Sequence, residues 1–199
     1  MIISAPSGAG KSTVCRRLRR RNASLKYSVS TCTRKPRPSE VEGRHYRFIS
    51  VPEFRRRIRR GEFIEWARVH GNYYGTPKGF IAREIRAGNV VLLDIDVKGA
   101  GIIRRRMRDA VTIFLLPPSW SSLERRLRLR GDTDDAIGTR LANARKEFAH
   151  AKRYDYWVVN DVLATAVREV EAIILAERLR SRRRPGGRAR LANLTRNRE

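Results

Sequence analysis

The sequence is poor in the residues that build covalent and metal frameworks. It holds two cysteines and three histidines in 199 residues. Cys15 and Cys32 lie in different predicted elements and match no zinc-ligand spacing, so we interpret both as small packing residues that stay reduced. His45, His70 and His150 are isolated from one another along the chain. The sequence therefore indicates neither a disulfide-stabilised domain nor a zinc-binding one.

Long apolar runs are also missing. No stretch approaches the roughly 20 consecutive apolar residues that a transmembrane helix needs. The first four residues lack the basic leader of a secretory signal and are predicted to form a short strand. We therefore expect one cytoplasmic domain without a membrane partner, of a length that suits a single core.

Acidic residues are scarce relative to basic ones. The chain has 45 Lys and Arg against 20 Asp and Glu, a formal net charge of +25. The basic residues are mostly arginines spread over many segments, a distribution that coding bias could produce as well as function. Because phosphate contacts release counterions, we expect weak nonspecific nucleic-acid binding at low salt. The chain contains no recognisable RNA- or DNA-binding motif, which argues against a dedicated nucleic-acid role.

The most informative residues present are those of the segment 5–12, with the sequence APSGAGKS. This glycine-rich segment follows a short apolar strand and precedes a predicted helix, an order that is typical of phosphate-binding loops. Backbone N–H groups of such a loop and the N-terminus of the next helix bind phosphate oxygens. Lys11 would reach the outer phosphates, and Ser12 would offer its hydroxyl to Mg²⁺. A glycine-rich turn before an ordinary helix is the alternative, and Ala5 stands where the motif has its first glycine.

Strands and helices alternate along most of the chain. This alternation predicts an α/β fold of the phosphate-loop NTPase type, with a mostly parallel sheet flanked by helices. The runs 89–96 and 111–116 are continuously apolar, as parallel strands covered on both faces are. The other predicted strands are 1–4, 27–33, 46–49, 63–69 and 156–159, the predicted helices are 11–22, 51–60, 76–87, 121–129, 136–149 and 163–180, and residues 70–75 are predicted to form a turn.

Four further segments narrow the function. They are 28–37 (SVSTCTRKPR), 63–66 (FIEW), 71–77 (GNYYGTP) and 93–99 (LDIDVKG). In this order and spacing, together with the glycine-rich loop, they make the chain resemble the bacterial guanylate kinase family from residue 2 to about 180. The resemblance implies Mg²⁺-dependent transfer of the γ-phosphoryl group from ATP to GMP or dGMP, giving ADP and GDP.

The resemblance implies an acceptor site with a phosphate end and a base end. Two guanidinium forks could hold a phosphate bidentately, and tyrosine hydroxyls could donate to the same group. A carboxylate could accept hydrogen bonds from both N1–H and the 2-amino group of guanine, which adenine cannot offer. By resemblance Arg34, Arg37, Tyr46 and Tyr74 hold the phosphate, and Glu65, Ser30, Thr76 and Asp94 hold the base. The alternatives are that the arginines are solvated loop charges and that Glu65 faces water from an edge strand.

The resemblance also implies a site for ATP at the glycine-rich loop. Asn160 and Asp161, which follow the last predicted strand, match a family position near the adenine of ATP. The full set that we expect to bind ATP is Ala5, Pro6, Ser7, Gly8, Ala9, Gly10, Lys11, Ser12, Asn160 and Asp161.

Asp94 and Asp96 end an apolar strand, where open α/β sheets place ligand-binding groups. We favour Asp94 for the nucleotide site, with a possible second role in holding Mg²⁺ through water, while Asp96 could be structural. No general base is expected, because an acceptor phosphate is already ionised and transfer depends on positioning and charge stabilisation.

The segment 121–146 resembles the lid of the family, which closes over the reacting phosphates. By position we assign Arg130 and Arg140 to the catalytic set, with Lys11 and Arg37. This lid is about one residue shorter than in relatives, so Arg128 is an alternative to Arg130. An amphipathic helix with a basic face is the simpler interpretation of the other arginines here.

The predicted organisation has a core, a lobe and a lid within one domain at 1–180. The core comprises 1–29, 76–120 and 147–180, the GMP-binding lobe 30–75 and the lid 121–146, and residues 181–199 form a basic, flexible tail. A kinase for a sugar bisphosphate is one rival, against which Glu65 argues because a sugar has no guanine edge. A phosphopeptide-binding scaffold is another, against which the intact Gly10-Lys11-Ser12 argues.

Overall fold

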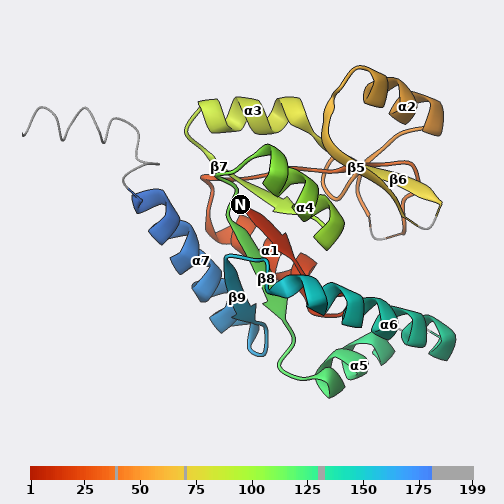
Figure 1. Ribbon diagram of the computed structural model, residues 1–199, viewed down its shortest axis with the longest axis vertical. Coiled ribbons are helices and arrows are strands. Elements are labelled where there is room, and N and C mark those ends of the chain that lie inside the picture. Colours follow the sequence, from red (N-terminus) through yellow and green to blue (C-terminus); the bar gives the residue numbers. More distant parts are fainter. Residues whose placement is uncertain (39, 70, 130–132, 181–199) are drawn as a thin grey trace, which may run out of the picture.

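The computed structural model describes residues 1–38, 40–69, 71–129 and 133–180. Five strands form the central sheet in the order β2-β7-β1-β8-β9 (Figure 1). Every pairing in this sheet is parallel. The strands are β1 (Ile2–Ser4), β2 (Leu25–Tyr27), β7 (Val90–Asp94), β8 (Thr112–Leu116) and β9 (Tyr156–Val159). The predicted α/β class with a mostly parallel sheet is confirmed.

Helices cover both faces of this sheet, and β1 shows how. Ile3 packs with α1 (Lys11–Arg21) and α7 (Leu163–Leu179), whereas its neighbour Ile2 packs with α3 (Lys78–Arg86) and α4 (Val97–Arg106). Successive side chains of a strand point to opposite faces, so a strand buried on both faces must be apolar throughout. The continuous apolar runs at β7 and β8 have the same cause.

A second sheet of four strands lies beside the core, in the order β4-β3-β6-β5. It consists of β3 (Thr31–Cys32), β4 (Arg47–Phe48), β5 (Phe63–Val69) and β6 (Asn72–Pro77). The helix α2 (Val51–Arg59) packs on it through Phe54, whose ring stacks on those of Phe63 and Tyr73 at centroid distances of 4.5 and 5.4 Å. Ile64 of β5 joins the core cluster of α3 and α4, which fixes the second sheet against the core.

Two sequence predictions inside this region are wrong. Residues 27–33 do not form one strand: the chain leaves the central sheet after β2 and enters the second sheet at β3. Residues 72–77 form β6 rather than a turn followed by the first residues of a helix, because β6 pairs with β5 on one side and β3 on the other. Pairing on both sides overrides the local turn preference of Asn and Gly. Gly75 is required there, since an added Cβ would lie 2.9 Å from both Phe54 and Phe63.

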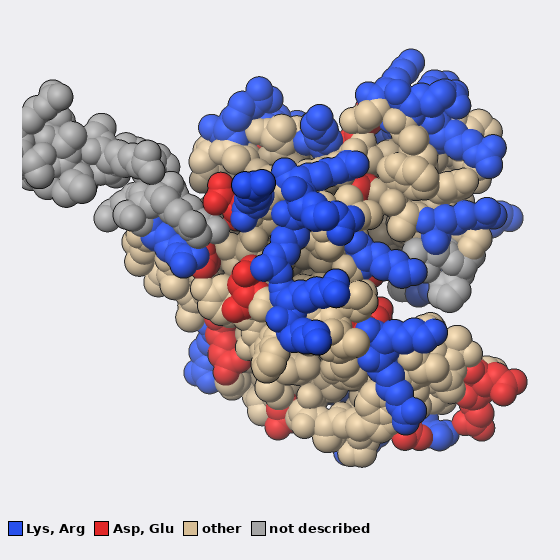
Figure 2. All heavy atoms as spheres, viewed as in Figure 1, with Lys and Arg blue, Asp and Glu red and all other residues tan. Residues whose placement is uncertain are grey.

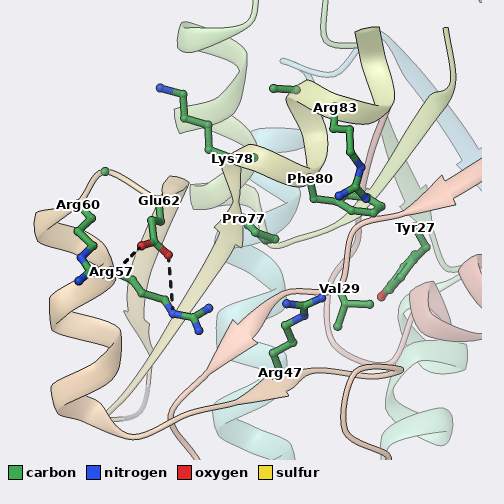
Figure 3. A pocket seen from close by; sticks show the side chains of 13 residues that line it. Tyr27, Val29, Arg47, Arg57, Arg60, Glu62, Pro77, Lys78, Phe80 and Arg83 are labelled. Atoms are coloured by element: carbon green, nitrogen blue, oxygen red, sulfur yellow. Dashed lines mark ion pairs between the residues drawn. The ribbon is translucent and has the colours of Figure 1, made fainter. Parts of the chain in front are cut away.

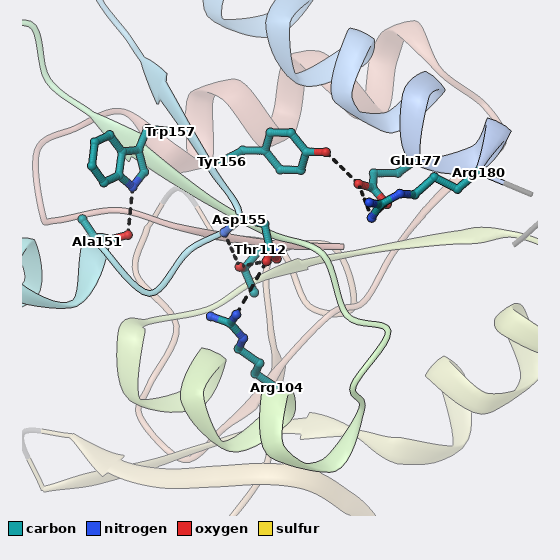
Figure 4. Close-up of polar contacts among 8 residues, drawn as sticks. All are labelled: Arg104, Thr112, Ala151, Asp155, Tyr156, Trp157, Glu177 and Arg180. Atoms are coloured by element: carbon teal, nitrogen blue, oxygen red, sulfur yellow. Dashed lines mark hydrogen bonds and ion pairs between the residues drawn. The ribbon is translucent and has the colours of Figure 1, made fainter. Parts of the chain in front are cut away.

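Polar contacts fasten β9 at the edge of the central sheet (Figure 4). Asp155, just before β9, accepts hydrogen bonds from the backbone and hydroxyl of Thr112 at 2.8 and 2.7 Å. The Tyr156 hydroxyl donates to Glu177 of α7 at 2.7 Å. The Trp157 indole donates to the Ala151 carbonyl at 2.8 Å. These contacts fix the strand that leads into Asn160.

The remaining helices are α5 (Trp120–Arg128) and α6 (Asp134–Ala151), which lie together at one end of the molecule (Figure 1). Together these two helices make up most of the segment 121–146 that is predicted to be the lid. Ser119 and Thr133 cap their N-termini through side-chain oxygens. The predicted tail at 181–199 and Arg130 lie outside the described residues. Among the helices that the structure does describe, none is long and apolar enough to cross a bilayer.

Candidate functional site

The glycine-rich loop lies between β1 and α1, at the carboxyl edge of the central sheet. Gly8 and Gly10 adopt left-handed conformations, with φ of 94° and 88°. A Cβ at Gly10 would lie 2.4 Å from Asn160 Nδ2, and one at Gly8 would lie 2.9 Å from Leu123. Within the described part of the chain, no side chain caps the N-terminus of α1. The loop therefore offers the positive end of this helix to an anion.

Pro6 differs from the other predicted ATP-binding residues of this loop. Its side chain is buried, and a proline has no backbone N–H to donate to a phosphate. Its carbonyl accepts a hydrogen bond from Ala9 N at 3.1 Å, which closes a turn within the loop. Ala5 and Ala9 are buried as well. The side chain of Ala5, at the first position of the motif, thus packs into the core. The geometry shows that Pro6 shapes the loop, and its contact with ATP stays a prediction.

Lys11 forms an ion pair with Asp94, the last residue of β7. Burial favours the neutral amine, but the Asp94 carboxylate outweighs it and raises the pKa of Lys11. The lysine is therefore charged and held over the end of the sheet. Ser12 follows it with an exposed side chain. The predicted site residues Lys11 and Asp94 thus contact each other directly, and the sequence did not indicate this contact.

Two side chains from elsewhere in the fold contact the loop, and a third contacts Asn160 beside it. Asn160 Nδ2 donates to the Ala9 carbonyl at 2.7 Å. Arg140 of α6 donates to Ser7 Oγ at 3.0 Å. Arg126 of α5, which sequence reasoning did not single out, donates to the Asn160 carbonyl at 2.9 Å. The predicted residues Asn160 and Arg140 therefore contact the loop, and Asp161, next to Asn160 in the chain, is exposed.

Arg128, the alternative lid arginine, is engaged elsewhere. It is exposed and pairs with Glu124 at 2.9 Å and with Asp134 at 2.8 Å. The contact with Glu124 lies within α5, and the contact with Asp134 joins α5 to the first residue of α6. Arg128 thus connects the two helices instead of contacting the loop in this structure.

A cavity of about 260 Å³ opens beside Lys11, between the end of the central sheet and the second sheet. Its walls combine residues far apart in sequence, because β7 ends where β5 and β6 pass. The predicted site residues that line it are Lys11, Ser30, Tyr46, Glu65, Tyr74 and Asp94. The structure thus gathers six residues of the predicted set around one space.

Glu65 is a nearly buried carboxylate in this wall, 7% exposed. The Thr76 hydroxyl, also buried, donates to its Oε1. Burial raises the pKa of Glu65, while the hydrogen bond from Thr76 acts in the opposite direction. Gly99 makes room for the carboxylate, since a Cβ there would lie 3.1 Å from Oε2. A buried carboxylate with one side-chain donor favours a ligand that brings further donors.

At the predicted phosphate end, both arginines contact Glu40. Arg34 is held bidentately by Glu40, with distances of 2.5 and 2.6 Å, and its guanidinium lies 5.1 Å from the centre of the Tyr46 ring. The hydrogen bonds from Arg34 lower the pKa of Glu40 to about 2. Arg37 is exposed, and its backbone N–H donates to Glu40 at 2.9 Å. Neither arginine lines the cavity here, although Tyr46 and Tyr74 do.

Two further carboxylates lie near the loop. Asp96 caps α4 by accepting a hydrogen bond from Gly99 N at 2.7 Å, which agrees with the structural role considered for it. Glu147 of α6 was missed by sequence reasoning; burial and then the nearby Asp96 charge raise its pKa. Among the residues that the structure describes, no group of three or more His, Cys, Asp or Glu is arranged to hold a metal by itself.

Comparisons with known proteins agree on one family. The family model described as guanylate kinase matches residues 1–177. A curated guanylate kinase of Rhizobium meliloti is 50% identical, covering 94% of this chain and 86% of the relative, and that of Carboxydothermus hydrogenoformans is 46% identical, covering 92% and 90%. A crystal structure of guanylate kinase from Anaplasma phagocytophilum is similar with a TM-score of 0.78 at 34% identity, covering 94% of this chain and 90% of that one. The chain belongs to the guanylate kinase family.

Proposed function

We propose that the chain transfers the γ-phosphoryl group of ATP to GMP, giving ADP and GDP. The observation that carries the proposal is the buried Glu65 carboxylate in a cavity that also contains the ion-paired Lys11. One space thus presents a group suited to guanine and a group suited to phosphate. The membership of the family supports the same reaction.

The base end of the cavity would select guanine. N1–H and the 2-amino group of guanine are adjacent donors, which the second oxygen of Glu65 and a neighbouring acceptor can both receive. Adenine would place an unprotonated ring nitrogen against the carboxylate and leave a buried charge unpaired. Thr76 keeps the carboxylate oriented, and Ser30 and Asp94 would complete the contacts to the base.

The phosphate end would act through positioning and charge. Lys11 would exchange its contact with Asp94 for the outer phosphates of ATP, and Arg140, already at Ser7, would neutralise charge on the transferred group. Arg34 and Arg37, joined through Glu40, would hold the acceptor phosphate with Tyr46 and Tyr74. The acceptor phosphate is ionised at neutral pH, so none of these residues needs to remove a proton.

The residues present fit a magnesium ion that arrives with ATP. Mg²⁺ usually keeps several waters and takes one or two protein ligands together with substrate phosphates. The exposed Ser12 hydroxyl would supply such a ligand, with Asp94 acting through water. The ion would neutralise phosphate charge when bound. The use of dGMP as well as GMP and a place in the cytoplasm belong to the same proposal.

A coupled ADP-release assay with ATP and magnesium tests the proposal, with GMP, dGMP, AMP, CMP, UMP and ribose 1,5-bisphosphate as acceptors. Turnover with the guanine nucleotides and little with the others is the expected result. Lys11→Ala should abolish transfer while leaving the protein folded, with Lys152→Ala, exposed at the end of α6, as the control. Folded protein that binds GMP and turns over none of the acceptors would contradict the proposal.

A further inference from the structure

A second cavity, of about 620 Å³, lies outside the nucleotide site. It shares no lining residue with the cavity at Glu65. Residues that are adjacent in sequence line different cavities. Val29 and Arg47 line the larger cavity, whereas Ser30 and Tyr46 line the smaller. Adjacent side chains of an extended chain point in opposite directions. The larger cavity therefore lies on the opposite side of the connection between the central sheet and the second sheet.

The walls of this cavity are strongly basic. Five cationic side chains line it, against Glu62 as the one carboxylate in the lining. Figure 3 shows the guanidinium groups of Arg47, Arg57 and Arg83 directed toward the shared space, while the Lys78 amine points away. The basic surface of the molecule extends well beyond this cavity (Figure 2), so charge alone does not define a site. The feature that defines a site here is the convergence of three guanidinium groups in one cavity.

Carboxylates satisfy these guanidinium groups incompletely. Glu62 lies 3.8 Å from both Arg57 and Arg60, which is a loose ion pair. Arg57 also contacts Glu53 at 2.8 Å. Arg47 is exposed, and it forms no ion pair with any residue in the described ranges. An unpaired guanidinium next to two other cations favours an anion that neutralises all three.

The three arginines belong to different parts of the fold. Arg47 is on β4 and Arg57 on α2, both within the second sheet and its helix. Arg83 is on α3, which packs against β7 of the central sheet. Its guanidinium lies 5.2 Å from the Phe80 ring centre and contacts the adjacent Glu84 at 2.8 Å, an exposed pair that contributes little by itself. A ligand that bound all three arginines would connect the second sheet to the core.

We infer that this cavity binds a small molecule with two or more phosphate groups, held jointly by Arg47, Arg57 and Arg83. Each guanidinium fork suits bidentate contact with a phosphate, and a single phosphate is too small to reach every wall. The volume lies within the range of pockets that hold small ligands, about 300–1,000 Å³. Because the ligand bridges the core and the second sheet, its binding also changes the affinity of the nucleotide site for GMP, and GMP changes the affinity for the ligand by the same factor.

Titration calorimetry with inorganic tripolyphosphate tests the inference. The nucleotide site is kept full with GMP and a non-hydrolysable ATP analogue, and magnesium is in excess over all phosphates. We expect one tripolyphosphate to bind per chain, with affinity falling about tenfold or more in Arg47→Gln/Arg83→Gln. The matched control is Arg108→Gln/Arg178→Gln, which removes the same charge from exposed residues outside the cavity. Thermal unfolding confirms that both double variants fold.

The remaining outcomes each overturn the inference. An equal loss of affinity in the two double variants means that net charge alone binds the probe. Equal affinity for inorganic phosphate and tripolyphosphate means that a single phosphate suffices. Tighter binding of a short single-stranded oligonucleotide, lost in Arg47→Gln/Arg83→Gln, means that the cavity belongs to a nucleic-acid surface. GMP affinity is measured in a separate titration, with only the ATP analogue bound beforehand. The same GMP affinity with and without bound tripolyphosphate overturns the inferred coupling between the two sites.

Discussion

Three carboxylates near the nucleotide site have the same chemistry and three different environments. Asp94 forms an ion pair with Lys11, Asp96 caps α4, and Glu65 is buried with the Thr76 hydroxyl. The charge of Asp94 is therefore balanced by Lys11, that of Asp96 stabilises the N-terminus of α4, and that of Glu65 remains available to a ligand. The identity of a residue does not decide its role here; the partner that the fold gives it does.

Glu65→Gln should relax the choice of guanine while stabilising the free protein. The amide replaces one carboxylate oxygen with an NH₂ group, which cannot accept a hydrogen bond from guanine, so kcat/KM for GMP should fall relative to that for AMP. Because burial raises the pKa of Glu65 in the folded state, folded protein binds more protons than unfolded protein above the ordinary carboxyl pKa of 4.5. The contribution of Glu65 to the free energy of unfolding therefore falls as pH rises from 4.5 toward its raised pKa in the folded protein. The Glu65→Gln variant does not titrate and keeps its stability over this pH range.

Thermal unfolding from pH 4 to 7 and acceptor kinetics measure both effects. The gap in Tm between the variant and wild type should widen as pH rises. Glu169→Gln, an exposed position on α7, is the control and should show neither effect. A Glu65→Gln protein that is destabilised at neutral pH and keeps its guanine preference would contradict the assignment.

Gly10→Ala should disrupt the phosphate loop. The residue has φ of 88°, and a Cβ would lie 2.4 Å from the Asn160 amide that binds Ala9. We expect a loss of about 1–3 kcal/mol in the free energy of unfolding and weaker ATP binding. Gly88→Ala is the matched control, since φ there is 76° and nothing lies within 4 Å of the added Cβ. Denaturant unfolding separates the two: equal losses would mean that backbone strain alone matters.

At the scale of elements, helix α6 is the part of the predicted lid that reaches the loop. Arg140 donates to Ser7, and burial raises the pKa of Glu147 on the same helix beside Asp96. Both residues come from α6 because positions seven apart return to the same helix face. The helix therefore contributes a cation and a carboxylate to one side of the site.

Arg140→Gln should lower kcat by roughly 100-fold, with a smaller change in the KM for GMP. The glutamine side chain is two atoms shorter than the arginine and uncharged, so it brings no positive charge to the transferred phosphate. Arg145→Gln, on the same helix and 5.2 Å from the Trp120 ring centre, provides the comparison and should retain activity. Steady-state kinetics with both substrates varied measure the difference. A rise in KM alone would assign Arg140 to ground-state binding.

The sequence predicts the elements that local pattern determines and misses those that pairing determines. The apolar runs predict β7 and β8, and the glycine-rich loop predicts the start of α1. The sequence predicts a turn and a helix start where β6 lies, because its Asn and Gly residues favour turns and its strand partners lie elsewhere in the chain. The same limit applies to side chains. Pairing of Arg34 with Glu40 and of Lys11 with Asp94 depends on loop and tertiary geometry that residue types alone do not specify.

At the scale of the whole molecule, the net charge of +25 dominates long-range interactions. Lys and Arg cover much of the face seen in Figure 2, and the last turn of α4 alone carries Arg104, Arg105 and Arg106. A potential of this kind raises the local concentration of nucleotides and speeds their encounter. It also attracts any other polyanion, with little regard for its sequence.

Binding to random duplex DNA should accordingly be strong at low salt and weak at physiological salt. If the surface neutralises several phosphates at once, affinity should fall by about 10³-fold or more between 50 and 200 mM salt. Fluorescence anisotropy with two duplexes of unrelated sequence measures this dependence. Affinity that persists at 200 mM, or a preference for one duplex, would indicate a dedicated nucleic-acid function instead.

The two buried cysteines make the opening of the molecule measurable in two places. Cys15 lies in the core cluster beneath the phosphate loop, and Cys32 lies in β3 of the second sheet, 2% and 0% exposed. Burial raises the pKa of both thiols, so neither reacts until its surroundings separate. The rates at which a thiol reagent consumes them therefore report two separate openings, one for each sheet. Ligands that fasten one sheet without the other will slow one rate alone.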